Sequence, residues 1–452
     1  MAGPILSVLF IIVVARLLLR NYNPQAVLLL AGLSMLVVAY FLKLPLPDLQ
    51  RPTGVVGFDF FASIKESFSK TNASVGLMIM AIGGFVAYMD KIGASDILVH
   101  LAMKPLQLFK RNPYLAASMV IPIAQVLFIA IPSAAGLSLL LMASLFPILI
   151  RLGVSRLSAV SVITASTAFG IGPACATTAS AIEIMDMDTV FYFLHYQIPL
   201  VWPLSLVMMV TYYFTNRYFD QKNKEKTEEI PNTEAAKPSV PAIYALLPIL
   251  PIVLLLVFSE IFSFFENPIY LDTSTVMFIS LFVALGFEAI RHRQLKTLMA
   301  SLQVFWNGMG DIFKSVVTLI ITADIFAKGL ISLGFIDGLI SSTTSMGFSM
   351  TGIGIAMTIM IFLAAMLMGS GNAAFFAFGP LVPNIAGQLS MGTTTLMLPM
   401  QLAASMGRTV SPVSGVLIAT AEIAKVSSMD IVKRNLIPLG AALLVMLVYH
   451  FM

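Results

Sequence analysis

Residues 349–390, SMTGIGIAMTIMIFLAAMLMGSGNAAFFAFGPLVPNIAGQLS, decide how this chain folds. The run is mostly apolar and carries the small polar stretch GSGN (369–372) at its middle, and the apolar run 113–150 likewise carries PSAAG (132–136). A helix needs about 20 apolar residues to cross a bilayer. Each run is therefore either two full spans joined by a buried loop or a re-entrant hairpin that enters and leaves on one side. The polar middles favour two hairpins.

The composition around these runs places the chain in a membrane. Of the 452 residues 58% are hydrophobic and 11% are charged, and the mean hydropathy is +0.94. Soluble domains contain about 25% charged residues, so a soluble multi-domain enzyme is excluded, and the long apolar runs argue against a β-barrel. The net charge of +4 suggests no nucleic-acid partner, and one cysteine and four scattered histidines imply neither disulfide, metal site nor cofactor.

The apolar runs predict about ten transmembrane helices beside the two hairpins. The clear spans are 4–20, 24–43, 74–92, 189–215, 242–263, 273–290, 312–335 and 431–452, and two more, 157–183 and 395–424, are interrupted by Gly, Pro, Ser and Thr. With an external N-terminus, most of the 26 Lys and Arg residues fall on the cytoplasmic side, as the positive-inside rule requires. The amphipathic 45–72 stretch is predicted to be an external loop. The fold class is all-α and polytopic.

The two halves of the chain show a weak internal repeat. Gly93 corresponds to Gly334, which lies 241 residues later, and Ser166 corresponds to Ser405, which lies 239 residues later. An odd number of crossings in each half turns the second copy upside down, which gives the inverted-topology repeats of many secondary transporters. The predicted units are a first transmembrane repeat at 1–215 with hairpin 113–150, a cytoplasmic linker at 216–241, and a second, inverted repeat at 242–452 with hairpin 349–390.

The two interrupted helices supply further polar groups inside the membrane. TASTAFGIGP (164–173) and ASMGRTVSPVSG (404–415) cannot form unbroken helices, because proline removes a backbone donor and glycine weakens a helix. Half-helix N-termini suit a carboxylate, and free carbonyls and hydroxyls suit a hard cation. Alternatively, these small residues only allow close helix packing. The predicted substrate-binding residues are Ser133, Ala134, Gly136, Ser166, Thr167, Ser370, Gly371, Asn372, Ser405, Arg408, Thr409 and Ser411.

Arg408 and Asn372 have the sharpest individual predictions. A buried arginine is costly in a bilayer unless it faces a polar cavity or a partner. Arg408 would either hold a substrate carboxylate through two hydrogen bonds or pair with an acid such as Glu183 or Asp337. Asn372 would offer its amide to a carboxylate or its carbonyl to a cation, or else only close the hairpin tip.

Five segments resemble the anaerobic C4-dicarboxylate carriers of the DcuC type. They are SVGLMIMAIGGFVAYMDKIGASD (74–96), KPLQ (104–107), LLMASLFP (140–147), GSGNAAFFAF (369–378) and GRTVSPVSGV (407–416). The resemblance implies a multi-pass carrier of succinate, fumarate and malate in the bacterial inner membrane, working by efflux or exchange during fermentation. The broader ion-transporter superfamily implies inverted repeats, two re-entrant hairpins and an elevator-like moving domain.

The hairpin-tip motif of such carriers, a Ser-Asn-Thr-like triplet, falls on Ser133-Ala134-Ala135 and on Ser370-Gly371-Asn372. The first triplet departs from the motif, because alanines follow Ser133. No metal site is therefore assigned beyond a Na⁺ position near Ser133, Ser370 and Asn372, and the coupling ion, H⁺ or Na⁺, stays open.

The sequence thus predicts a secondary active transporter of small dicarboxylate anions that works by alternating access and dimerises through its scaffold spans. It is not predicted to be an enzyme, since no nucleophile–base pair or metal cluster is present. The alternatives are the same fold carrying another organic anion or acting as a sodium/proton antiporter, a membrane-embedded enzyme, and a passive channel.

Overall fold

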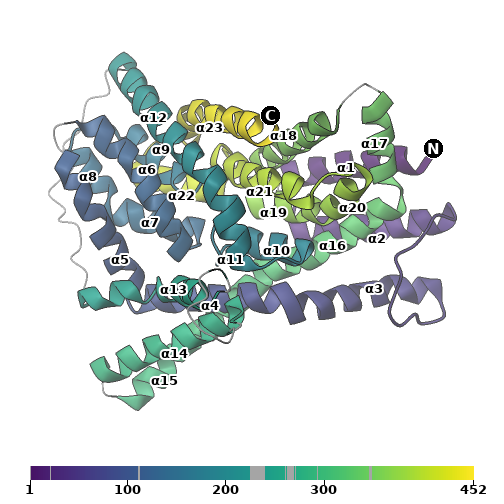
Figure 1. Cartoon of the computed structure of the whole chain (residues 1–452), viewed down its shortest axis with the longest axis horizontal. Coiled ribbons are helices and arrows are strands. Elements are labelled where there is room, and N and C mark those ends of the chain that lie inside the picture. Colours follow the sequence, from purple (N-terminus) through teal and green to yellow (C-terminus); the bar gives the residue numbers. More distant parts are fainter. Residues whose placement is uncertain are drawn as a thin grey trace.

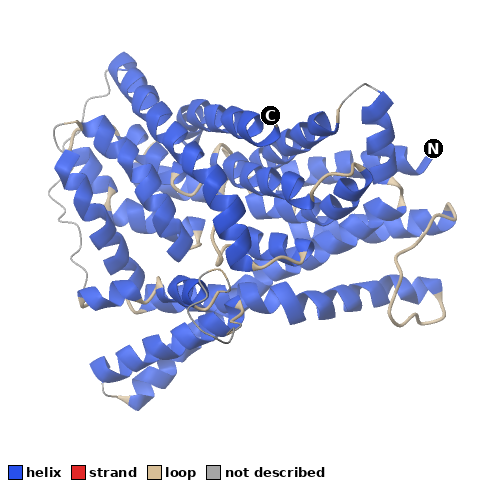
Figure 2. Ribbon diagram, viewed as in Figure 1, coloured by secondary structure: helices blue, strands red, loops and turns tan. Residues whose placement is uncertain are grey.

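Every regular element that the structure describes is helical (Figures 1 and 2). The computed structural model describes residues 2–20, 22–109, 112–223, 240–259, 261, 269, 271–292, 294–345 and 349–452. The first half contains α1 (Ala2–Leu19), α2 (Pro24–Phe41), α3 (Val56–Thr71), α4 (Leu77–Lys91), α5 (Ala94–Met103), α6 (Pro113–Ala130), α7 (Ala134–Ser144), α8 (Phe146–Arg151), α9 (Arg156–Ala165), α10 (Ala176–Met185), α11 (Thr189–Tyr192) and α12 (Ile198–Asn223).

The second half follows the predicted linker, most of which lies outside the described residues. It contains α13 (Leu250–Val257), α14 (Thr273–His292), α15 (Leu295–Ile312), α16 (Thr318–Ser332), α17 (Phe335–Ser345), α18 (Met350–Met368), α19 (Gly371–Phe378), α20 (Val382–Gln388), α21 (Thr393–Thr409), α22 (Gly415–Ala424) and α23 (Ser428–Phe451).

Eight helical stretches of the described chain are long and apolar enough to cross a membrane. They are Pro24–Phe41, Val56–Lys91, Pro113–Ala130, Thr189–Lys222, Thr273–His292, Lys296–Ser332, Met350–Met368 and Ser428–Phe451. Shorter apolar helices include Gly3–Leu18, Arg156–Ala165 and Gly415–Ala424. The predicted all-α, polytopic fold class is confirmed.

Two predictions about individual segments are wrong. Residues 56–71 are not a loop but the helix α3, whose polar side chains include Ser67 facing α16. Residues 242–263 do not form one continuous helix in their described part: a 3-10 helix (Ala242–Leu246) and a turn precede α13. Pro248 in that turn has no backbone donor, so it cannot make the hydrogen bond that a continuous helix would have at this position.

The two longest helical stretches cross at π-helical turns. The turn η1 (Asn72–Gly76) joins α3 to α4, and η5 (Phe313–Val317) joins α15 to α16. The two turns contact each other, and a Cβ placed on Gly76 would lie 3.2 Å from Cγ1 of Val317. Figure 1 shows the crossing beside the label α4. Turns of this kind insert one extra residue into a helix and are frequent at functional sites.

A polar triad joins α3 to α16 within these long stretches. The Lys328 Nζ lies 2.9 Å from Oδ2 of Asp324, and Ser67 Oγ donates to the same oxygen at 2.6 Å. Lys328 also donates to Ser67 Oγ at 2.8 Å. Because a charged pair inside a membrane-spanning stretch is costly without partners, the third group helps to satisfy both ions.

The helices of the two halves follow in the same order. α16 begins 241 residues after α4, α18 begins 237 after α6, and α22 begins 239 after α10. Helices of each half pack on a long helix of the other half. α2 and α3 of the first half pack on α16 of the second, and α14 and α15 of the second half pack on α4 of the first. A duplicated unit would give this common order.

Candidate functional site

Both predicted hairpin segments have a helix break at their polar middle. The breaks are tip 1 (residues 131–136), where α6 gives way to α7, and tip 2 (residues 369–372), where α18 gives way to α19. Ser133 Oγ accepts a hydrogen bond from Gly136 N at 3.1 Å, and Ser370 Oγ accepts one from Ala373 N at 3.2 Å. The two serines are therefore N-caps, and each hydroxyl still has a donor to offer.

Tip 2 lies directly against α21 and the break that follows it. A Cβ on Gly371 would lie 2.7 Å from the Ala404 carbonyl oxygen, and one on Gly369 would lie 2.8 Å from the Val413 carbonyl oxygen. Gly369 also has a φ of +69°, a conformation that favours glycine. Glycine is thus required at both positions for this close approach. We call residues 410–414, which separate α21 from α22, break 2.

Gly371→Ala should displace tip 2 from α21 and lower transport several-fold, because the added methyl meets backbone rather than a movable side chain. Gly415→Ala is the matched control: Gly415 likewise starts a half-helix after a serine, but a Cβ there meets nothing within 4 Å. Initial rates of substrate uptake into vesicles check the prediction. Equal rates in the two variants would contradict the tight seating of tip 2.

The other interrupted helix meets the end of α6 and α21 at the same time. We call residues 166–175, between α9 and α10, break 1. Gly172, with a φ of +97°, lies against Ile129 at the end of α6, and a Cβ on Gly170 would lie 2.7 Å from Ser405 Oγ of α21. Segments from both halves of the chain therefore converge at break 1.

Arg408 reaches from α21 to break 1. Its Nη2 donates to the Thr167 carbonyl oxygen at 2.6 Å and lies 3.5 Å from Thr167 Oγ1. The arginine is half-buried, and Arg408 makes no ion pair with any residue that the structure describes. Asp337, considered above as its partner, instead accepts a hydrogen bond from Gln388. A positive charge whose neighbours are neutral is suited to an incoming anion.

A buried amide network that the sequence did not predict joins break 1 to α21. Gln401 Nε2 donates to the Gly170 carbonyl oxygen at 2.8 Å and to Thr178 Oγ1 at 3.0 Å, and its Oε1 accepts from Tyr192 OH at 2.9 Å. Gln197 donates to Thr178 Oγ1 at 2.9 Å and accepts from Gly172 N at 2.9 Å. Both glutamines are fully buried. Their amides hold break 1 in place, and the guanidinium of Arg408 brings a positive charge to the same break.

The remaining predicted site residues have mainly local contacts. Ser166 Oγ donates to the Val162 carbonyl, Thr409 Oγ1 donates to the Ser405 carbonyl, and Ser411 Oγ accepts from Val413 N. Ala134 and Asn372 are half-buried, and a Cβ on Gly136 would lie 3.9 Å from Asp90 Oδ2. Thr167, Gly371, Ser405 and Arg408 are brought together around α21.

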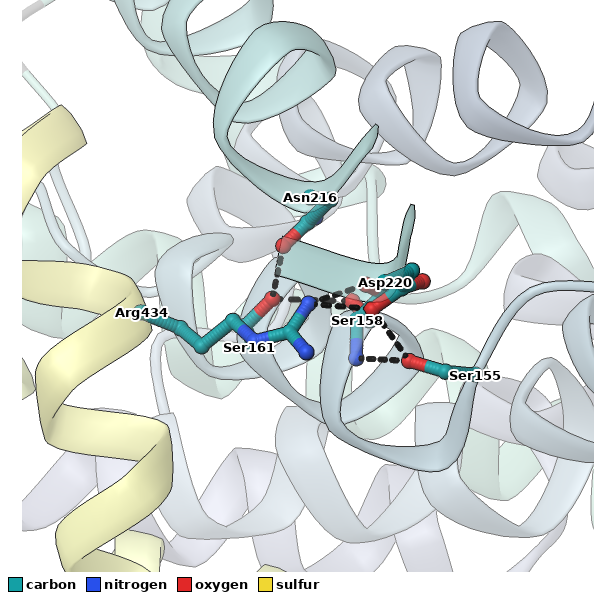
Figure 3. A network of polar contacts seen from close by, with 6 residues as sticks. All are labelled: Ser155, Ser158, Ser161, Asn216, Asp220 and Arg434. Atoms are coloured by element: carbon teal, nitrogen blue, oxygen red, sulfur yellow. Dashed lines mark hydrogen bonds and ion pairs between the residues drawn. The ribbon is translucent and has the colours of Figure 1, made fainter. Parts of the chain in front are cut away.

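A second buried network ties α9, α12 and α23 together (Figure 3). Arg434 Nη1 lies 2.5 Å from Asp220 Oδ1, and both side chains are almost completely buried. Ser155 and Ser158 donate to the Asp220 oxygens at 2.9 and 2.8 Å. Next to Arg434, Asn435 Nδ2 donates to Thr164 Oγ1 and to the Thr409 carbonyl, which continues the network to the end of α21. These contacts hold both interrupted helices in one unit.

The chain is similar to known membrane transporters over nearly its whole length. The family model for the C4-dicarboxylate anaerobic carriers, DcuC, matches residues 3–452. The anaerobic C4-dicarboxylate transporter DcuC of Escherichia coli O6:H1 is 34% identical to this chain, and the match covers 98% of this chain and 95% of the transporter. A probable anaerobic C4-dicarboxylate transporter DcuC of Vibrio cholerae is 32% identical, and the match covers 96% of this chain and 94% of that protein. In fold, the chain is similar to the YdaH transporter of Alcanivorax borkumensis, with a TM-score of 0.60 and 12% identity over 95% of this chain and 98% of that one. It is also similar to MtrF of Neisseria gonorrhoeae, with a TM-score of 0.57 and 12% identity over 95% of each chain.

Proposed function

Because the chain belongs to the DcuC family of anaerobic C4-dicarboxylate carriers, we propose that it carries C4-dicarboxylates across the membrane, binding them where tip 2, break 1 and α21 converge. Its membrane helices and its family make it a multi-pass protein of the bacterial inner membrane and a transporter rather than an enzyme. Succinate, fumarate and malate are the proposed substrates.

The position of Arg408 supports this site most strongly. Its guanidinium is half-buried, and in the described part of the chain its hydrogen bonds go to neutral Thr167 rather than to a carboxylate. A substrate carboxylate would supply the missing negative charge through a bidentate pair. The second carboxylate would lie at tip 2, where the free N–H groups at the start of α19 and the Asn372 amide are available.

Alternating access would move the hairpins and interrupted helices against the long helices that cross at η1 and η5. The proposed elevator-like motion needs two inverted repeats and two re-entrant hairpins. It is supported by the common helix order, by the exchanged packing on α4 and α16, and by the networks that join α9, α12, α21 and α23. The long helices would form the static scaffold and the interface of a homodimer, and the direction would be efflux or exchange.

The test is uptake of labelled succinate into proteoliposomes preloaded with unlabelled succinate. We expect saturable counterflow that fumarate and malate inhibit and that monocarboxylates do not. Imposed Na⁺ and H⁺ gradients, applied one at a time, identify the coupling ion, for which the hydroxyls of Ser133 and Ser370 and the Asn372 carbonyl are the candidate Na⁺ ligands. Gradient-driven Na⁺/H⁺ exchange without succinate flux would overturn the proposal in favour of an antiporter.

A further inference from the structure

Asn435 of α23 is fully buried, and both polar atoms of its side chain have partners. Its Oδ1 accepts a hydrogen bond from Tyr212 OH of α12 at 2.9 Å. Its Nδ2 donates to the Thr409 carbonyl oxygen at 3.0 Å and to Thr164 Oγ1 at 3.1 Å. A backbone carbonyl oxygen can only accept, so Nδ2 must face Thr409 and the orientation of the amide is fixed. One amide therefore joins α23 to α9, α12 and α21.

The two groups to which Nδ2 donates are neighbours of the contact between Arg408 and Thr167. Thr409 directly follows Arg408 and is the last residue of α21. Thr164 lies in the last turn of α9, three residues before Thr167, and its carbonyl oxygen accepts from Thr167 Oγ1 at 3.1 Å. The Arg408 guanidinium in turn donates to the Thr167 carbonyl oxygen. The ends of α9 and α21 are thus joined twice, once by Asn435 and once by Arg408.

A bound carboxylate would affect these two links differently. The Arg408 guanidinium would turn its donors toward the anion, so the contact with Thr167 is the link that a substrate can replace. The Asn435 amide is neutral, buried and already hydrogen-bonded, and it has no comparable reason to change partners. The last turn of α21 is therefore held by Asn435 when the guanidinium engages an anion. A charged group binds well only when its supporting residues keep it in place.

We propose that Asn435 is a positioning residue of the dicarboxylate site: it fixes the ends of α9 and α21 relative to each other, and so fixes where the Arg408 guanidinium meets the substrate. This inference rests on the proposed function, in which Arg408 binds a carboxylate. Without the amide, the Thr409 carbonyl and the Tyr212 hydroxyl would be buried without this partner, which is costly. The last turn of α21 would shift to satisfy them, the guanidinium would move with it, and affinity for succinate would fall.

The test compares Asn435→Ala with Asn216→Ala in succinate counterflow. Asn216 is the matched control, because it is a buried asparagine whose Oδ1 accepts from Ser161 Oγ at 3.3 Å, a bond that joins α12 to α9 and does not involve α21 (Figure 3). Asn435→Ala should raise the KM for succinate about tenfold with a smaller change in the maximal rate, and Asn216→Ala should leave the KM unchanged. Tyr212→Phe keeps both donors of Asn435 and should raise the KM less.

A combined variant shows whether Asn435 acts through Arg408. Because an arginine that is absent cannot be displaced, Asn435→Ala should add no further increase in KM to that of Arg408→Gln. Hydrogen exchange followed by mass spectrometry gives a readout that needs no transport. The backbone amides of residues 164–168 and 405–410 should exchange several-fold faster in Asn435→Ala than in the wild type, and Asn216→Ala should leave residues 405–410 unchanged.

A wild-type KM and wild-type exchange in Asn435→Ala would overturn the proposal. So would equal increases in KM in the two asparagine variants, or an effect of Asn435→Ala that multiplies with that of Arg408→Gln, since either would make Asn435 a structural residue only. The milder Tyr212→Phe variant guards against misfolding of Asn435→Ala. Faster exchange at residues 405–410 in Asn435→Ala, in a protein that shows no succinate counterflow, would support the positioning of α21 and count against the proposed function only.

Discussion

Arg408→Gln should lower dicarboxylate transport by about tenfold to a hundredfold, because a hydrogen bond to a charged group contributes roughly 1.5–3 kcal/mol and each 1.4 kcal/mol is a factor of ten. The substitution keeps a polar amide but removes the charge that would hold the substrate, together with the guanidinium nitrogen that reaches Thr167. Arg408→Lys keeps the charge and loses the planar fork, so its rate should fall between those of Arg408→Gln and the wild type. Initial rates of succinate counterflow measure all three.

Thr167→Val serves as the matched control for Arg408. It removes Oγ1, which lies 3.5 Å from the guanidinium, and retains the carbonyl oxygen, which accepts at 2.6 Å. We therefore expect a much smaller loss of transport than in Arg408→Gln. An Arg408→Gln protein that is normally inserted and transports succinate at the wild-type rate would remove Arg408 from the substrate site.

The second large effect concerns stability, in the network of Figure 3. Asp220→Ala should lower the free energy of unfolding by about 3–5 kcal/mol, because it leaves the buried guanidinium of Arg434 without its carboxylate. Ser155 and Ser158 lose their acceptor in the same variant. Denaturant unfolding of the detergent-solubilised protein, followed by a helix signal, measures the loss.

Two further variants separate the ion pair from the volume it fills. Asp220→Leu combined with Arg434→Leu replaces both charges by apolar groups, and replacing a buried pair in this way is often neutral in stability. The double variant should therefore be more stable than Asp220→Ala. If Asp220→Ala unfolds at the wild-type denaturant concentration, the pair does not hold α9, α12 and α23 together.

Sequence alone located the breaks because glycine, proline and serine interrupt otherwise apolar runs. The same signal singled out Arg408, since a guanidinium within such a run needs a partner or a polar cavity. It also predicted that Ser133 and Ser370 lie at helix breaks. Their role as N-caps depends on the local backbone path, which composition does not determine.

The buried networks escaped prediction because their members are far apart in the chain. Gln401 meets Gly170 across 231 residues and Arg434 meets Asp220 across 214, so no spacing motif connects them. Asp220 lies in the polar stretch assigned to the linker, where a charge is expected to be solvated. The available signal was Gln401 itself, an amide inside the apolar run LMLPMQLAAS, which needs buried partners.

Thiol modification of Cys175 tests the central claim most directly. It is the only cysteine in the chain and lies in break 1, where a Cβ on Gly170 would come within 3.3 Å of its sulfur. Cys175 is buried in this structure, so it reacts only when break 1 opens, and a dicarboxylate bound between break 1 and Arg408 would block that access. Saturating succinate should therefore slow its reaction with a small methanethiosulfonate several-fold, whereas a monocarboxylate should not, and Arg408→Gln should abolish the protection. An unchanged or faster reaction in protein that demonstrably transports succinate would contradict a binding site at this convergence.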